Sequence, residues 1–315
     1  MDIKRPFRIG TRGSPLALAQ ASEVRGRISA SSGLGEDAFE IVVIKTSGDR
    51  IQDRALRDIG GKGLFTKEIE EALSAGAIDI AVHSAKDMPA VPPDGLLLDV
   101  FLPREDVRDA FVSPRYSRIA DLPEGAVVGT SSVRRRAQLL NRRRDLRVVE
   151  FRGNVQTRLA KLASGTADAT FLAMAGLNRL GAKDVPSTPI DPEDMLPAPG
   201  QGAIVIERRE GDNGSQSLTE PLSDRATCLR LAAERGFLAE LDGSCDTPIA
   251  GLAEIKGDVL HLRGEILRQD GSEAISDEIS GPVESGDALG RELARDLLAR
   301  AGEGFLVRSG RIAKS

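Results

Sequence analysis

The chain has 315 residues, of which 40% are hydrophobic and 29% are charged, so it is long enough for two or three domains with substantial cores. Its net charge is −5 and only 3% of its residues are aromatic, which argues against a general nucleic-acid binder and against binding to an anionic membrane surface. Two cysteines exclude a disulfide scaffold, and no apolar run approaches the ~18 residues of a membrane span. Residues 1–8 lead directly into a strand-like segment without an apolar signal region, so we expect a cytoplasmic protein.

Short β-rich segments alternate with helical patterns from the N-terminus to about residue 207. This alternation predicts an α/β fold with βαβ units and mainly parallel sheets. The expected strands cover residues 7–12, 40–46, 78–82, 96–101, 109–113, 126–129, 147–151, 168–172 and 203–207. The expected helices cover about 15–30, 65–75, 133–141 and 155–163.

The last third of the chain has a different pattern. Apolar residues recur at helical spacing over 223–241, and this helix should end at Gly243. Apolar runs follow, separated by KGD at 256–258 and by DG at 270–271, which are hairpin turn signals. With a closing helix over about 287–301, this region is expected to form a small α+β domain with an antiparallel sheet.

Two proline-rich crossings, at 102–108 and 195–202, bracket the middle βα block. If the strand at 203–207 returns to the first sheet, the middle block is a domain inserted into the first. Two connectors of this kind form a double hinge around a ligand-binding cleft. The expected domain limits are 1–101 with 201–220, 105–197, and 223–315.

Arginine is concentrated in one window of the sequence. Between Arg134 and Arg158 there are nine arginines and two acidic residues, so this window carries +7 and the rest of the chain −12. The run 142–144 fits a solvated helix face. Arg134, Arg135, Arg152 and Arg158 instead follow predicted strand ends, where open α/β sheets bind ligands.

Three strand-to-helix turns support an anion-binding cleft. They are RGSP at 12–15, GTSS at 129–132 and RGN at 152–154, each with helix-start N–H groups near an arginine. An ordinary helix cap is the alternative at each turn, but the three together favour a polyanion. Phosphate motifs do not match, because Gly63 stands where a P-loop needs Ser or Thr and no GxGxxG follows a strand. Arginine pairs equally well with carboxylates, so a ligand with many carboxylates fits.

The segment HSAKDMP at 83–89 leaves the apolar run IDIAVH, which predicts a strand buried on both faces. Lys86 and Asp87 therefore occupy a position where catalytic loop residues are often found. A carboxylate here can transfer protons and stabilise a developing cation; the alternative is a surface ion pair. His83 is interpreted as a hydrogen-bonded core residue, and two histidines without ligand spacing predict no metal site.

The two cysteines lie in different settings. Cys228 falls inside a predicted helix and is interpreted as a core or flanking residue. Cys245 lies in LDGSCDTP at 241–248, a rigid loop on which a thiol can carry a covalent group. The polar stretch 46–63 is longer than ordinary βα loops, which suggests an active-site lid.

Eight motifs occur in the order found in a known family and cover essentially the whole chain. They are RIGTRGSPLALAQA, GGKGLFTKEIE, DIAVHSAKDMP, REDVRDAF, VGTSSVRRRAQL, FRGNVQTRL, PAPGQGAI and GSCDTPIA. The sequence thus resembles the porphobilinogen deaminase (hydroxymethylbilane synthase) family. The resemblance implies a transferase of porphyrin and heme biosynthesis that condenses four porphobilinogens head to tail, with release of four ammonias, into the linear tetrapyrrole hydroxymethylbilane. It also implies a three-domain fold, with two domains like periplasmic binding proteins, and a covalently bound dipyrromethane cofactor on which the chain grows.

The matching motifs imply the site residues. Asp87 corresponds to the catalytic acid/base, and Cys245 to the thioether attachment point of the dipyrromethane. Many family members carry Lys four residues before the GGKG lysine, where this chain has Asp58, so no contact is assigned there. The other implied cofactor-binding residues are Ser84, Lys86, Thr130, Ser132, Arg134, Arg135 and Gly202. The implied substrate-binding residues are Arg12, Ser14, Lys62, Ser131, Arg152, Arg158, Arg179 and Gln201.

Two other kinds of function stay open at this point. A non-enzymatic two-domain anion-binding module explains the cleft and the arginines, but not Cys245 in a rigid loop of a third domain. Nucleic-acid binding through 134–147 is disfavoured by the net charge and the scarcity of aromatic residues. We expect porphobilinogen as the small-molecule partner, no nucleic-acid or membrane partner, and a monomer.

Overall fold

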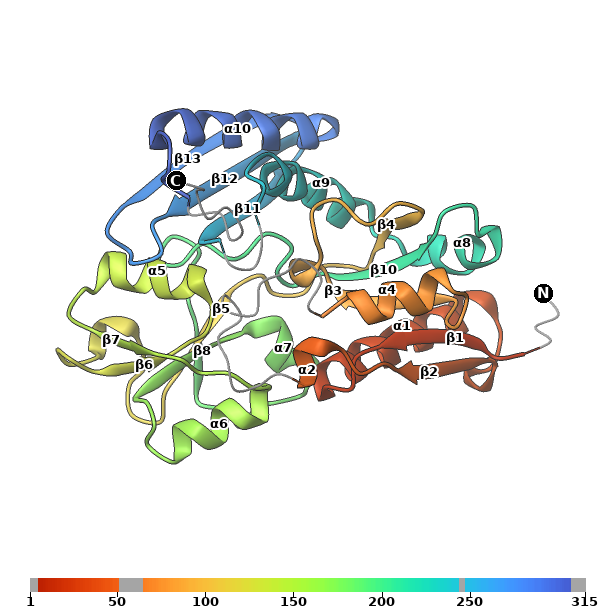
Figure 1. The fold of residues 1–315 in the computed structure, drawn as a ribbon, viewed down its shortest axis with the longest axis horizontal. Helices are drawn as coiled ribbons and strands as arrows, with labels where there is room; N and C mark the ends of the chain where they lie inside the picture. The colour runs from red at the N-terminus through yellow and green to blue at the C-terminus, as the bar shows by residue number, and fades with distance from the viewer. Residues whose placement is uncertain (1–4, 51–64, 244–246, 307–315) are drawn as a thin grey trace, which may run out of the picture.

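The protein is described by a computed structural model that covers residues 5–50, 65–243 and 247–306. Its strands form three sheets, with sheet 1 at the right of Figure 1, sheet 2 at the lower left and sheet 3 at the top. Sheets 1 and 2 have five strands each, pair them both parallel and antiparallel, and are accompanied by helices. Sheet 3 is a three-stranded antiparallel sheet. This confirms the predicted fold class.

Sheet 1 has the strand order β2-β1-β3-β10-β4. Its strands are β1 (Phe7–Thr11), β2 (Phe39–Val43), β3 (Ile80–Ser84), β4 (Leu96–Phe101) and β10 (Ile204–Arg209). The helices of this part are α1 (Pro15–Ser32), α2 (Ser47–Arg50), α4 (Lys67–Ser74) and α8 (Asn213–Thr219). Helix α1 begins where expected, because Ser14 accepts a hydrogen bond from the Ala17 backbone N–H and Pro15 occupies the first turn. Its face toward the sheet packs Val24 and Ile28 into the core of sheet 1.

Sheet 2 has the strand order β7-β6-β8-β5-β9. Its strands are β5 (Asp109–Val112), β6 (Val127–Gly129), β7 (Arg147–Val149), β8 (Ala169–Ala173) and β9 (Ser187–Pro189). Its helices are α5 (Val133–Arg142), α6 (Val155–Ala163) and α7 (Met174–Arg179). Strand β9 and helices α7 and α8 were not predicted, because three to seven residues are too few for a clear periodicity.

The prediction of mainly parallel sheets is wrong in part. β10 runs antiparallel to both β3 and β4, and β5 runs antiparallel to both β8 and β9. The chain enters β5 and β10 through the two connectors rather than through a helical crossover. A βαβ crossover is what makes neighbouring strands parallel, so these two strands are free to pair in the other direction.

Sheet 3 consists of β11 (Ile249–Lys256), β12 (Val259–Leu267) and β13 (Ala274–Pro282). Both predicted hairpin turns are confirmed by the antiparallel pairing of these strands. Two helices, α9 (Arg225–Glu240) and α10 (Gly286–Ala301), pack against each other and against the sheet, around the fully buried Phe237. The short 3-10 helices of the chain are Glu36–Ala38, Ala85–Asp87, Ile119–Asp121, Glu220–Leu222 and Val283–Ser285.

The two connectors between sheets 1 and 2 are fixed to sheet 3 by one buried ion pair. Arg104 of the first connector donates from Nη1 and Nη2 to Glu234 of α9, at 2.7 and 3.0 Å. Glu234 also accepts hydrogen bonds from the backbone N–H groups of Gly200, in the second connector, and Ala253, in β11. The two side chains are 2% and 0% exposed, so all three parts of the molecule meet at this carboxylate. Among the described residues, none of the helices combines the length and apolar character that crossing a bilayer requires.

Candidate active site

Asp87 ends the short helix that follows the central strand of sheet 1. β3 is buried at its first four positions and continues directly into Ala85–Asp87, which brings the carboxylate out at the strand's C-terminal end. Asp87 is exposed and lines a cavity of about 80 Å³. The same cavity is lined by Arg12, Ser14, Gln20, Phe65 and Ser84.

Contacts around this cavity fix two of the predicted site residues. The Arg12 guanidinium lies 4.3 Å from the centre of the Phe65 ring, which is a cation–π contact. Gln20 Nε2 lies 2.9 Å from Ser84 Oγ, so α1 holds the end of β3. The structure therefore brings four of the predicted residues, Arg12, Ser14, Ser84 and Asp87, to one cavity.

Lys86, next to Asp87, contacts the connector that returns from sheet 2. Its Nζ donates to Gln201 Oε1 at 3.3 Å, and no ion pair joins it to Asp87 within the described part of the chain. Burial lowers the pKa of Lys86 to about 8, against the opposing charge of Asp87 and with a smaller contribution from Arg135. Lys86 is thus a cation that has no ion-pair partner among the described residues, beside the candidate catalytic carboxylate.

The turn at 200–202 needs its two glycines. Gly200 and Gly202 have φ angles of +78° and +90°, which favour glycine. A Cβ on Gly200 would lie 2.9 Å from the Lys86 backbone N, and a Cβ on Gly202 would lie 2.5 Å from the Glu105 carbonyl oxygen. The turn can therefore pack tightly against the segment that carries Lys86 and Asp87.

Asp109 forms the buried centre of a charge cluster on sheet 2. Arg134 Nη1 donates to Asp109 Oδ2 at 2.8 Å, and Arg135 Nη2 donates to Asp109 Oδ1 at 2.7 Å. Gln201 Nε2 donates to the same Oδ1 at 3.0 Å. Burial on its own would raise the pKa of Asp109, but the two guanidinium groups hold it well below its ordinary value. Arg134 and Arg135 are thus buried, and Asp109 balances part of their charge.

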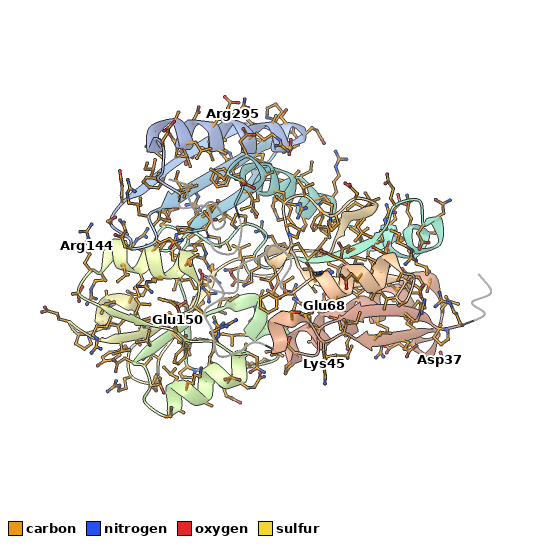
Figure 2. All side chains as sticks on the ribbon, in the orientation of Figure 1. Asp37, Lys45, Glu68, Arg144, Glu150 and Arg295 are labelled. Atoms are coloured by element: carbon orange, nitrogen blue, oxygen red, sulfur yellow. The ribbon has the colours of Figure 1, made fainter. Side chains whose placement is uncertain are left out.

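A second group of arginines surrounds Arg158. Burial lowers the pKa of Arg158 to about 10, and the nearby positive charges of Arg135 and Arg152 add to this effect. Arg158 Nε donates to the Gly153 carbonyl oxygen at 3.0 Å, at the start of α6. Three guanidinium groups that repel one another give this region a positive potential. In contrast, Arg142 and Arg144 lie toward the surface as predicted, and Figure 2 shows Arg144 at the outer edge of the molecule. Arg143 departs from the prediction, because it is half-buried and donates to the carbonyl oxygens of Ile119 and Leu122 at 3.0 and 2.9 Å.

The hydroxyl oxygens between β6 and α5 each accept a hydrogen bond from a backbone N–H group. Ser132 caps α5 by accepting from the Arg135 backbone N–H, and Ser131 Oγ accepts from the Phe151 backbone N–H at 3.0 Å. Thr130 Oγ1 accepts from the Ser132 backbone N–H at 3.2 Å. Ser132 is thus a helix cap, and the O–H of each of the three groups remains a donor for a ligand oxygen.

Arg179 connects three separate segments. Its Nη2 donates to the Gly202 carbonyl oxygen at 3.0 Å, and its Nε donates to Glu23 of α1 at 3.3 Å. With its side chain 9% exposed, Arg179 holds α7 against both α1 and the second connector. It therefore lies beside the glycine turn that contains Gln201 and Gly202.

His83 is confirmed as a hydrogen-bonded core histidine. Its Nε2 lies 3.0 Å from Glu207 Oε2 of β10, and both side chains are nearly inaccessible. Glu70 of α4 lies close by, and burial, together with the charge of Glu207, raises the pKa of Glu70 above its ordinary value. The described residues contain no group of three or more His, Cys, Asp or Glu side chains suited to a metal ion.

Several predicted residues lie outside the described part of the chain. They are Lys62 and Cys245, and most of the expected lid at 46–63, with Asp58, also lies outside the described residues. Cys228 is described and half-buried, with its Sγ 3.3 Å from Ser223 Oγ, in agreement with a flanking residue of α9.

Sequence reasoning missed four residues that organise the site, namely Gln20, Asp109, Gln138 and Glu207. Asp109 and Glu207 were placed in strands but given no role. A signal was present, because a carboxylate inside an otherwise apolar strand is costly unless it is paired. No comparable signal singles out a glutamine on a helix.

Two family models match nearly the whole chain. The model described as porphobilinogen deaminase, dipyromethane cofactor binding domain, matches residues 7–217, and the model of the porphobilinogen deaminase C-terminal domain matches residues 228–299. The chain belongs to the porphobilinogen deaminase family. Porphobilinogen deaminase of Paracoccus denitrificans (strain Pd 1222) is 62% identical over 304 residues, covering 96% of this chain and 97% of that one. Porphobilinogen deaminase of Nitrobacter hamburgensis is 54% identical over 299 residues, covering 95% of each chain.

Solved structures also align with this fold. A probable extracellular-binding protein of an amino-acid ABC transporter from Bacillus subtilis gives a TM-score of 0.43 at 13% identity, covering 69% of this chain and 91% of that one. As a porphobilinogen deaminase family member, this chain is an enzyme of tetrapyrrole synthesis with a dipyrromethane-binding domain.

The residues present fit a dipyrromethane by the chemistry of their side chains. Each of its pyrroles carries an acetate and a propionate, so the group needs several cationic partners. Arg158 lies in a region of positive potential, and Lys86 has no ion-pair partner among the described residues. All the Arg134 hydrogen bonds of the described part of the chain use Nη1, so Nη2 and Nε remain as donors for a ligand.

Proposed function

We propose that the enzyme condenses four porphobilinogens head to tail, releasing four ammonias, to give hydroxymethylbilane. The observation that carries this proposal is the position of Asp87. An exposed carboxylate lines the same small cavity as Arg12 and Ser14, while a group of mutually repelling guanidinium charges lies on sheet 2. A proton-transferring acid beside a polycarboxylate-binding region is what a reaction between acetate- and propionate-bearing pyrroles requires.

The proposed chemistry at Asp87 begins with the substrate's protonated aminomethyl group. The pyrrole nitrogen lone pair expels ammonia, which breaks the C–N bond and leaves an azafulvenium cation. The Asp87 carboxylate stabilises this positive charge electrostatically. When bound, the dipyrromethane supplies the free α-carbon nucleophile. This α-carbon would form the new C–C bond with the methylene carbon of the azafulvenium and would then lose its own proton. Asp87, or a base relayed through it, accepts that proton, and ammonia and proton together leave as one ammonium ion per condensation.

The other roles are assigned by the same proposal. Arg12, Ser14 and Ser131 hold the incoming porphobilinogen with Lys62, Arg152, Arg158, Arg179 and Gln201. Ser84, Lys86, Thr130, Ser132, Arg134, Arg135 and Gly202 hold the cofactor, and Cys245 carries its thioether. We further propose that the enzyme is a cytoplasmic monomer with three domains, at 1–101 with 201–220, 105–197 and 223–315.

The cofactor assignment is tested by the intact mass of the purified protein. Cys228→Ser is a matched control for Cys245→Ser, since each removes one of the two thiols. We expect the wild type and Cys228→Ser to carry the added mass of two porphobilinogens less two ammonias, and Cys245→Ser to have the bare mass. An adduct that disappears with Cys228→Ser instead would overturn the attachment site. If none of the proteins acquires the adduct even after incubation with porphobilinogen, a non-enzymatic anion-binding module becomes the better account.

The catalytic assignment is tested with Asp87→Asn, which keeps the size of the side chain and removes its charge. We expect turnover of porphobilinogen to fall by about 10²–10⁴-fold or more, in the range typical for loss of a general acid/base. Asp94→Asn, on the loop before β4, is the matched control, because it makes the same substitution at another exposed aspartate outside the cavity. Turnover of Asp87→Asn within tenfold of the Asp94→Asn value would contradict the role.

A further inference from the structure

Helix α5 lies between the arginine cluster and sheet 3. Its first turn carries Arg134 and Arg135, while its other turns contact the strands and turn of sheet 3. Asn141 Nδ2 donates to the Gly271 carbonyl oxygen at 3.0 Å, in the turn between β12 and β13. Figure 1 shows α5 directly below sheet 3, so this helix is in contact with the part of the molecule that follows Cys245 in the chain.

Gln138 is the residue of α5 that connects Arg134 to sheet 3. Its side chain is 0% exposed, and its Oε1 accepts from Arg134 Nη1 at 3.0 Å. Its Nε2 donates to the Leu196 carbonyl oxygen at 3.2 Å and to Glu265 Oε2 at 2.6 Å. Both N–H groups and the carbonyl of this amide are therefore engaged, which fixes its orientation.

Glu265 is a buried carboxylate of β12 without a cationic partner among the described residues. It is 8% exposed, and its hydrogen bond within this part of the chain comes from Gln138. A buried carboxylate is costly unless it accepts strong hydrogen bonds, and 2.6 Å is a short contact for an amide donor. In the strand register Glu265 lies opposite Ala250, which is five residues after Cys245.

We propose that Gln138 and Glu265 are positioning residues that fix the carboxylate-binding Arg134 relative to sheet 3. The inference rests on the proposed function, because it gives Arg134 a cofactor carboxylate to bind. Asp109 and Gln138 both hold Nη1, and Glu265 orients Gln138. Sheet 3 is thereby connected through one amide to a guanidinium whose Nη2 and Nε make no hydrogen bond within the described part of the chain.

The consequence is a defined geometry for cofactor loading. A cofactor carboxylate that binds Arg134 needs this guanidinium in a fixed orientation, so the contacts that orient Arg134 limit the rate of productive loading. Without Glu265 as acceptor, the Gln138 amide can rotate and Arg134 loses a fixed partner. Loss of one buried hydrogen bond corresponds to about a tenfold effect on an equilibrium or rate.

The test compares loading of cofactor-free protein by porphobilinogen, followed by intact mass over time. Gln138→Leu and Glu265→Leu remove the contact, and Glu265→Gln is the conservative variant because its amide oxygen still accepts from Gln138. Asn141→Ala is the matched control, since it removes another hydrogen bond between α5 and sheet 3 that does not reach Arg134. The loaded proteins are then assayed for KM and kcat, and all are compared by thermal unfolding.

We expect Gln138→Leu and Glu265→Leu to load at least tenfold more slowly and to show a raised KM, with the double variant no worse than Gln138→Leu alone. Glu265→Gln and Asn141→Ala should load within about twofold of the wild type, even where thermal stability falls. Leucine variants that load at the Asn141→Ala rate would overturn the inference while leaving the proposed function intact. A wild type that never acquires the adduct would overturn the proposed function, and this inference with it.

Discussion

Lys86 is a cation in an environment that favours its neutral form. Burial lowers its pKa from 10.5 to about 8, and its hydrogen bond goes to an uncharged amide oxygen. Between pH 8 and 10.5 the unfolded chain therefore binds more protons at this position than the folded one. The contribution of Lys86 to the free energy of unfolding therefore rises as the pH increases through that window. Below the window the buried, charged amine makes folding less favourable.

Lys86→Met should consequently stabilise the protein while weakening cofactor binding. We expect the free energy of unfolding in urea to rise by about 1–3 kcal/mol at pH 7, and the gain to shrink at about pH 9.5. Cofactor loading, followed by mass, should become slower because a carboxylate partner is lost. The exposed Lys183→Met is the control and should change neither quantity. A gain of equal size at both pH values would show that the effect comes from packing and not from the charge.

For single residues, the sequence singled out several buried polar side chains but did not identify the residues that pair with them. Arg134 and Arg135 were recognised from their position after a strand, yet their burial against Asp109 depends on a residue 25 or 26 positions away. Gln138 could not be found, because a glutamine on a helix is ordinary until the sheet that packs on it is known. His83 was interpreted correctly, since a histidine ending an apolar strand needs a hydrogen-bond partner, but nothing in the sequence pointed to Glu207 as that partner.

At the scale of elements, the Arg104–Glu234 ion pair fixes both connectors, which were predicted to form a double hinge, to helix α9. The pair is almost fully buried and each carboxylate oxygen also accepts a backbone N–H, one from the second connector and one from β11. A connector segment bound in this way cannot move independently of α9.

Removing one charge of this pair should be strongly destabilising. Glu234→Gln leaves the Arg104 guanidinium buried without a counter-charge, and we expect a loss of about 3–5 kcal/mol in the free energy of unfolding. Arg104→Met should have a smaller effect, since the two backbone N–H groups still bind the carboxylate. Urea unfolding of both variants and of the double variant gives the coupling between them. Additive losses would mean that the two side chains do not act as a pair.

The strand and helix assignments show where sequence periodicity is informative. β4 and α6 have the predicted bounds, β4 because it is a short apolar run and α6 because its apolar residues recur at helical spacing. β9 was missed because three residues with a proline carry no period, and the directions of β5 and β10 were missed because direction depends on how a strand is entered. The prediction that the chain returns to the first sheet near residue 203 was correct, since a β-rich segment followed the second proline-rich crossing.

For the whole molecule, the buried contacts join three sheets that have separate cores. Glu234 links both connectors to α9 and β11, and Gln138 links α5 to β12. The main cores of sheets 1, 2 and 3 are distinct clusters, around Ile9, Phe171 and Phe237 respectively. Two smaller apolar clusters also join the parts, because Phe101 of sheet 1 packs with Leu231 of α9, and Leu196 of the second connector packs with Leu252 of β11. Whether the protein unfolds as one unit thus depends on a few polar contacts and on these two small apolar clusters.

The chain offers a natural probe of this coupling. It has no Trp and a single Tyr, Tyr116, which packs against the core of sheet 2, so tyrosine fluorescence reports on that sheet alone. In the wild type we expect the thermal transition of Tyr116 fluorescence to coincide with that of the far-UV circular dichroism. In Glu234→Gln the two should separate, because both connectors lose their common attachment. Arg300→Ala, which removes an exposed ion pair with Asp277, is the control and should keep them coincident. Coincident transitions in Glu234→Gln would show that other contacts suffice to couple the sheets, whereas separate transitions in the wild type would show that sheet 2 unfolds independently.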